Sequence, residues 1–207
     1  FINNFNSMQI FFAMKLKSTI FIITLLFMNM SNSQNNTLPY YEIPDYPSEY
    51  NEGTVVARLI DGLGFRYYWA TEGLRAEDLA FKPSDDARTT GDTVDHILGL
   101  TNVVLHSALK KVNEPLDTEG MSFDEKRALT LNMLKQAADI FRSTDDLSQF
   151  KIVFKGENGN TEYPFWNQIN GPIADALWHC GQIITNRRSS GNPYNSKASV
   201  FTGKVRN

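Results

Sequence analysis

The stretch GPIADALWHCGQII, residues 171–184, decides the expected fold of this chain. Nearly every position in it is apolar or small, which is typical of a helix that is buried on most of its circumference. Proline suits the first position of a helix, so this helix is predicted to begin at residues 170–172. It is predicted to end near Arg188, because glycine and proline follow at positions 191 and 193.

Three polar residues interrupt this apolar stretch: Asp175, His179 and Gln182, at spacings of four and three residues. On a helix these spacings place them on one narrow stripe, with the first two side chains about 5–6 Å apart. Burying a carboxylate and an imidazole is costly unless they are paired or bind a metal. The stripe therefore has three interpretations: a metal site, a solvent-exposed face, or an Asp–His hydrogen bond without metal.

Outward from this helix, the next candidate ligand is His96, in the segment TVDHI of residues 93–97. A single histidine in the first turns of a helix is more often structural than a ligand. A shared ion would require His96 to lie within about 6 Å of Asp175 or His179, since Zn–N bonds are about 2.0–2.1 Å. His106 is ten residues further on, about 80° around the helix, so it is expected to be structural or on the surface.

Apolar periodicity predicts three further helices. They run from about Gly53 to Glu72, from Thr89 or Thr90 to about Val112, and onward from a capping box at residues 122–125. The third of these has a clear polar face and is expected at the periphery. The Asn-Gly pair at 158–159 predicts a hairpin turn between residues 150 and 166. The expected class is all-α, a four-helix bundle with a small hairpin-like insertion before the last helix and crossover connections after the first and third helices.

The beginning of the chain has the pattern of a secretory leader. Residues 14–33 combine a short basic start at Met14, an apolar run and small residues before a cleavage point near Ser33/Gln34. The apolar run of about 11 residues is shorter than the roughly 20 that span a bilayer, which argues against a stable membrane anchor. We expect residues 1–13 to be upstream, non-native sequence. The mature protein is expected to be periplasmic or secreted.

The remaining chain is expected to form an extended N-terminal arm (34–50), one helical domain (51–193) and a polar C-terminal tail (194–207). Residues 1–33 contain two lysines and no acidic residue, so removing them changes the formal net charge from −3 to −5. This acidic balance argues against nucleic acid as a partner, because nucleic acid binding needs a basic surface. A single cysteine, Cys180, excludes an internal disulfide framework, and a small buried hydrophobe is its expected role.

Several aromatic residues are ambiguous by position. Tyr67, Tyr68 and Trp69 end the first predicted helix, and Trp166 precedes the last one. They would line a pocket or, as is more common, belong to the core. Gln182 would support a ligand or be exposed.

Residues 171–193 and 92–97 resemble the last and the second helix of the DinB/YfiT-like superfamily, most specifically in the His-x-Gly-Gln-Ile piece followed by an arginine. The resemblance implies a four-helix bundle of metalloenzymes with one histidine on the second helix and a His-x-x-x-His pair on the fourth. His96 and His179 match two of these three positions. Asp175 stands where the family has the first histidine of the pair.

The ligand set implied by this resemblance is therefore His96, Asp175 and His179, two imidazoles and one carboxylate. Such a set suits a divalent ion such as zinc, nickel, iron(II) or manganese with open coordination positions. The expected function is that of a metal-dependent hydrolase or transferase with an unknown small-molecule substrate. The alternative is a non-catalytic bundle that binds a small ligand or partner and has a structural His/Asp cluster. Bundles of this type often pair, so a homodimer is a further expectation.

Overall fold

The computed structural model describes residues 37–207. The predicted upstream segment (1–13), the predicted signal peptide (14–33) and the first residues of the predicted arm lie outside this range. Residues Leu38–Asn207 form one compact unit. Within the described part of the chain, none of the helices has the length and apolar character needed to span a membrane.

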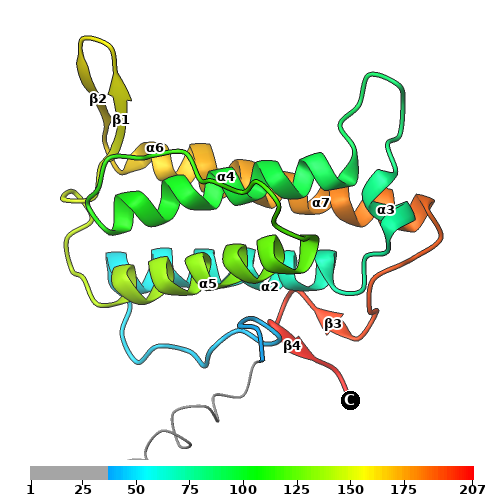
Figure 1. The fold of residues 1–207 in the computed structure, drawn as a ribbon. Coiled ribbons are helices and arrows are strands. Elements are labelled where there is room, and N and C mark those ends of the chain that lie inside the picture. The colour runs from blue at the N-terminus through cyan, green and yellow to red at the C-terminus, as the bar shows by residue number, and fades with distance from the viewer. Residues whose placement is uncertain (1–36) are drawn as a thin grey trace, which may run out of the picture. The chain divides into compact units, whose positions relative to one another are not determined.

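Four long helices dominate the unit: α2 (Glu52–Thr71), α4 (Thr90–Ala108), α5 (Phe123–Arg142) and α7 (Ala174–Ser189). Each of them packs against two others, in the cyclic order α2, α5, α4 and α7. Figure 1 shows α4 and α7 in one layer and α2 and α5 in the other. Helices that follow one another across the long connections, α2 to α4 and α5 to α7, are therefore diagonal neighbours, which confirms the predicted crossovers.

The core lies between these two layers and is made of leucine, isoleucine, alanine and aromatic side chains. Helix α5 packs on both α2 and α4, so the expectation that it is peripheral was wrong. Its polar face is exposed to solvent, but the opposite face carries a continuous stripe of buried apolar side chains. The fully buried members of that stripe are Leu131, Leu134, Ala137, Ala138 and Phe141.

Capping boxes fix the starts of the first three long helices. The predicted box at residues 122–125 is present, because Ser122 Oγ accepts a hydrogen bond from the amide of Glu125 and the Glu125 carboxylate accepts one from the amide of Ser122. Thr89 with Asp92 does the same for α4, and Asn51 with Thr54 for α2. Each box satisfies amide groups that a helix start would otherwise leave unpaired.

The start of the last helix differs from the prediction. Helical turns begin at α6 (Trp166–Gln168) and continue through a π-type turn, η1 (Ile169–Ile173), into α7. The backbone at Gly171 leaves helical geometry, with φ −95° and ψ −111°, one residue before Pro172. Proline lacks the amide hydrogen of a regular helix, and the wide turn and the kink accommodate it instead of ending the helix. Trp166, predicted to precede the last helix at the end of the hairpin region, lies in α6.

Two small antiparallel strand pairs make the protein mostly helical, not all-α as predicted. The expected hairpin is present as β1 (Ile152–Gly156) and β2 (Gly159–Tyr163). The second pair, β3 (Ala198–Ser199) with β4 (Lys204–Val205), lies in the predicted polar tail. A short helix, α3 (Ala76–Ala80), adds local order to the long connection before α4.

The segments before α2 and after α7 pack on the helices and on each other. The Ile43 amide donates to the Gly203 carbonyl at 2.9 Å, and both segments contribute to a small apolar cluster around Phe65. Tyr40 lies directly against Gly64, where an added Cβ would come within 2.3 Å of the Tyr40 ring. The glycine is thus needed for close packing.

Candidate metal centre

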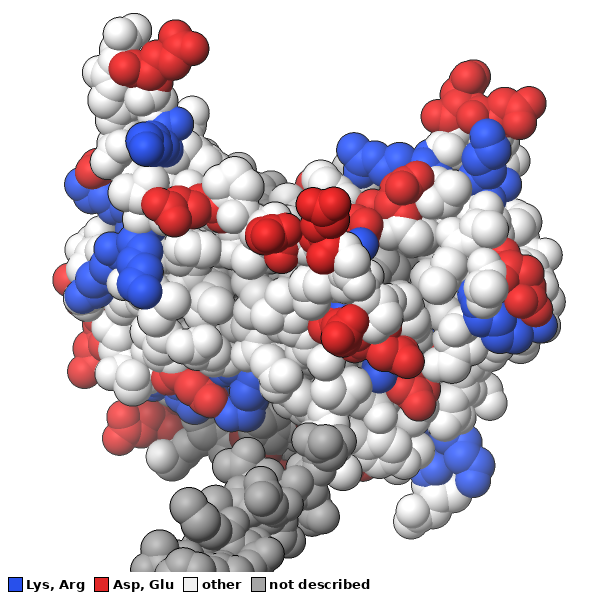
Figure 2. Space-filling view, viewed as in Figure 1, with Lys and Arg blue, Asp and Glu red and all other residues white. Residues whose placement is uncertain are grey.

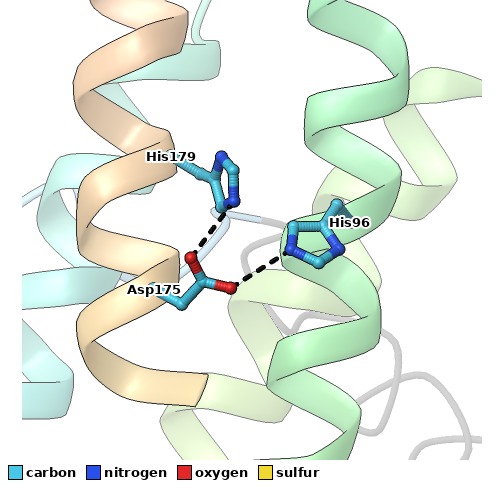
Figure 3. A group of neighbouring side chains, drawn as sticks. All are labelled: His96, Asp175 and His179. Atoms are coloured by element: carbon cyan, nitrogen blue, oxygen red, sulfur yellow. Dashed lines mark hydrogen bonds and ion pairs between the residues drawn. The ribbon is translucent and has the colours of Figure 1, made fainter. Parts of the chain in front are cut away.

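Asp175 and His179 lie one turn apart on α7, and their side chains point to the same side of the helix (Figure 3). His179 Nε2 is 3.2 Å from Asp175 Oδ1. The spacing of four residues produces this proximity, as the sequence predicted. The pair alone, however, would be an ordinary contact on a helix surface.

His96 reaches the same pair from α4, 79 residues earlier in the chain. Its Nε2 atom is 3.2 Å from Asp175 Oδ2, so the carboxylate lies between two imidazoles and gives one oxygen to each. The two rings are nearly perpendicular, with centroids 4.6 Å apart. The requirement that His96 come within about 6 Å of Asp175 or His179 is met.

These three residues could hold a metal ion, because one ligand atom from each can be chosen so that all lie within 4.8 Å of one another. Two atoms bound to a tetrahedral ion at 2.0–2.1 Å are about 3.3 Å apart, and each imidazole lies close to that distance, 3.2 Å, from its own oxygen of Asp175. Two imidazoles and one carboxylate are a donor set that divalent transition metals accept. The residues therefore fit the kind of ion that the sequence led us to expect.

Gln182 orients one of these rings. His179 Nδ1 lies 2.8 Å from Gln182 Oε1, and because an amide oxygen can only accept a hydrogen bond, this contact favours the tautomer with the proton on Nδ1. In the neutral ring, the Nε2 lone pair then faces the Asp175 carboxylate. Two lone pairs at this distance repel one another unless a cation or a second proton lies between them. A hydrogen bond from the other ring nitrogen to an oxygen, as from Nδ1 to Gln182, is common among metal-bound histidines.

The helix that carries the pair is less buried than predicted. Its inner face contains the buried Ala176, Cys180 and Ile183, whereas Trp178 on the other side is 71% exposed. The expectation of a helix buried almost all round was wrong, because α7 has neighbours on one side only, α2 and α4. The His179 side chain is 13% exposed, His96 34% and Asp175 39%, so the polar stripe lies at the boundary between core and solvent.

A groove of about 680 Å³ opens beside His179. It lies between α7, the first turns of α4 and the loop that leads into α4. Figure 2 shows this loop and the β1–β2 hairpin projecting from the same side of the unit, with a hollow between them. The groove is lined by Pro83, Ala87, Arg88, Thr93, Trp178, His179, Gly181, Gln182, Thr185 and Asn186.

The other residues that the sequence offered as ligands or pocket residues do not join this site. His106 Nδ1 contacts the Asn102 carbonyl within its own helix, at 3.0 Å. Cys180 is buried, and burial raises the pKa of its thiol to about 12, as suits a small apolar residue. Tyr67 is fully buried and Trp69 nearly so, whereas Trp166 is 75% exposed outside the groove. Arg88 and Trp178 were missed: only the fold brings Arg88 beside His179, and Trp178, the residue before His179, was counted among the apolar positions of its helix.

A second polar cluster occupies the C-terminal end of α7. Arg187 is buried and donates to the carbonyls of Trp69, Ala70 and Glu72 at 2.9–3.1 Å, which terminate α2. It also donates to the Asn192 carbonyl at 2.7 Å. Burial lowers the pKa of this guanidinium. The arginine of the family-like segment is therefore a cap for another helix and not a ligand.

Asp78 completes this closed cluster from α3. Its side chain is fully buried and accepts hydrogen bonds from Arg75, Ser190 and Asn192 at 2.6–2.9 Å. The hydrogen bonds from Arg75 lower the pKa of this carboxyl most, and those from Ser190 and Asn192 add to the effect. Together they hold this pKa far below its usual range, although burial by itself would raise it. Every oxygen of Asp78 is occupied by the chain itself, so this acid is not available to a metal.

Comparisons of the chain with known protein families, with curated proteins and with solved structures found no match.

Proposed function

We propose that this protein is an exported, metal-dependent enzyme of the DinB-like type, binding one divalent ion through His96, Asp175 and His179. The observation that carries the proposal is the convergence of two imidazoles and a carboxylate from separate helices beside an open groove. The likeness of residues 92–97 and 171–193 to the DinB/YfiT-like superfamily supports it, as does the arrangement of four long helices. The predicted signal peptide at 14–33 supports export.

Each residue has a distinct part in this proposal. His96 and His179 supply neutral nitrogen ligands, and Asp175 supplies an anionic oxygen that offsets one unit of the ion's charge. Gln182 holds the His179 ring so that its Nε2 atom faces the centre. Three protein ligands leave coordination positions open, which is typical of catalytic and not structural sites.

Hydrolysis or group transfer is the chemistry that such a centre suits. A divalent ion bound there would lower the pKa of a coordinated water toward 7 or polarise a carbonyl group. The groove gives a substrate access to the exposed side of His179, and Asp175 is open enough to solvent to admit water. The identity of the ion, the substrate, the homodimer and the absence of nucleic acid among the partners stay predictions.

Elemental analysis of untagged protein purified without chelator tests the metal site. Near-stoichiometric zinc, nickel, iron or manganese is expected in the wild type, and its loss is expected in the Asp175→Ala/His179→Ala double variant. His106→Ala is the matched control, because this histidine contacts only a carbonyl of its own helix and should leave the metal content unchanged. Circular dichroism must show that all three proteins remain folded.

A second candidate function follows from one feature of the same cluster. Because each Asp175 oxygen lies 3.2 Å from one imidazole, the three side chains can also form a hydrogen-bonded triad that joins α4 to α7 without an ion. The protein would then be a non-catalytic module that binds a ligand or partner. Absence of metal from the wild type, even after incubation with zinc, nickel, manganese and iron(II), would favour this function.

A further inference from the structure

The groove beside His179 has an unusual charge pattern. Among its lining residues Arg88 carries the permanent charge, and none of them is a carboxylate. Pro83 and Ala87 give part of the wall an apolar character. The polar side chains of Thr93, Thr185 and Asn186 already hydrogen-bond to neighbouring groups in the fold.

Arg88 differs from the other arginines between residues 37 and 207. The others donate to a carbonyl, hydroxyl or carboxylate, or lie over an aromatic ring, but Arg88 has no such contact within this part of the chain. The carboxylate of the nearby Asp92 accepts hydrogen bonds from Thr89, and Arg88 acts on it only through its charge, as the smallest of the effects that lower the Asp92 pKa. The Arg88 guanidinium therefore offers its donors to whatever enters the groove.

Trp178 supplies a flat apolar surface to the same groove. It immediately precedes His179 on α7 and is 71% exposed, although it is one of the largest apolar side chains of the protein. An exposed tryptophan at the wall of a groove offers a ring for stacking. The groove volume of about 680 Å³ falls in the range of roughly 300–1,000 Å³ that is usual for small-molecule sites.

We infer that this groove binds a small organic anion with an aromatic ring, its anionic group held by Arg88 and its ring lying on Trp178. The inference deepens the proposed function and rests on it for the reacting group, which would face His179. A divalent ion with one carboxylate ligand has a net positive charge, so the ion and Arg88 would both favour an anion. A guanidinium pairs especially well with carboxylates and phosphates because its donors match two oxygens at once.

Calorimetric titration with phenylacetate and with its neutral amide, phenylacetamide, tests this inference. Both are measured on metal-free and on zinc-treated protein. A Trp166→Phe background leaves Trp178 and the buried Trp69, which does not line the groove, so a change in fluorescence on binding is assigned to Trp178. The variants are Arg88→Gln and the matched control Lys82→Gln, which removes a cation from the same loop but outside the groove lining.

Phenylacetate is expected to bind at least about tenfold more tightly than phenylacetamide, equivalent to about 1.4 kcal/mol. The preference should disappear in Arg88→Gln, persist in Lys82→Gln, and be accompanied by a change in Trp178 fluorescence. Equal affinity for the two ligands, no binding of either, an unchanged Trp178 signal, or a preference that survives Arg88→Gln would overturn the inference.

The two proposals fail separately in this experiment. If zinc does not bind but metal-free protein shows the Arg88-dependent preference, the groove binds anions as inferred and only the enzymatic proposal is lost. If zinc binds at His96, Asp175 and His179 but the preference is absent, the metal site stands and the substrate class is wrong.

Discussion

Helix α7 carries two polar clusters whose surroundings are opposite. At its C-terminal end, Arg187 is enclosed and its donors are taken up by backbone carbonyls. About two to three turns earlier, Asp175 and His179 are partly exposed and contact chiefly one another and His96, and His179 borders an open groove. The first cluster is completed by the chain itself, whereas the second leaves binding capacity for something else. Satisfied hydrogen bonds indicate a structural role, and open ones a functional site.

The sharpest way to break the structural cluster is Arg187→Ala. The change leaves the buried carbonyls at the end of α2 without their donor, so we expect the free energy of unfolding to fall by about 3 kcal/mol or more. Urea unfolding followed by circular dichroism measures it. Arg188→Ala is the matched control, since Arg188 is exposed and lies over the Tyr194 ring, and should change stability by about 0.5 kcal/mol or less. Equal losses in the two variants would contradict this assignment.

Asp78→Asn probes the same cluster through pH. The pKa of Asp78 is depressed in the folded protein, chiefly by Arg75, so its stabilising contribution is present above the unfolded-state pKa of about 3.9 and is lost as the pH falls. We expect Asp78→Asn to cost about 2 kcal/mol at pH 7. The difference from wild type should shrink as the pH falls below about 4.

Unfolding curves collected between neutral and acidic pH measure this difference. Asp85→Asn is the control, because Asp85 is fully exposed in the loop before α4 and should not alter the pH dependence. A constant difference between wild type and Asp78→Asn at every pH would show that charge at Asp78 is not the cause.

Gln182→Ala tests the other cluster of α7, at Asp175 and His179. Gln182 is exposed, so its loss should leave stability unchanged, but it orients the His179 ring and should weaken metal binding about 10- to 100-fold. Competition with a chromophoric chelator measures the affinity. Thr185→Ala, another exposed groove residue of α7 that contacts only its own helix, should keep wild-type affinity. Lower stability with unchanged affinity would assign Gln182 to the fold instead.

Asp175→Asn is expected to change the free energy of unfolding only slightly. The Asp175 side chain, which contacts His96 and His179, is more than one-third exposed. In metal-free protein, the free energy of unfolding should therefore change by less than about 1 kcal/mol. Thermal unfolding in the presence of a chelator measures it. A loss as large as that of Asp78→Asn would mean that the triad holds α4 and α7 together, which would favour the non-catalytic function.

Local chemistry made several elements predictable. The box at Ser122 marks the start of α5 because the interactions that satisfy its amides lie within three residues. The Asn-Gly turn marks the β1–β2 hairpin for the same reason. The start of the last helix could not be predicted from Pro172, because a wide turn stabilised by packing replaced the expected helix boundary.

The candidate site also has a part that the sequence predicts and a part that depends on the fold. The proximity of Asp175 and His179 follows from helix geometry and is written in the sequence, and the expected third ligand, His96, came from a resemblance. Only the tertiary structure brings His96 within 3.2 Å of Asp175, across 79 residues of chain, because α4 packs against α7. The same packing turns Arg187 inward and Trp178 outward. The sequence by itself thus determined the helices, the hairpin and the polar stripe, through interactions between near neighbours. The meeting of distant side chains, and which of them stay open to a ligand, depended on how the helices pack.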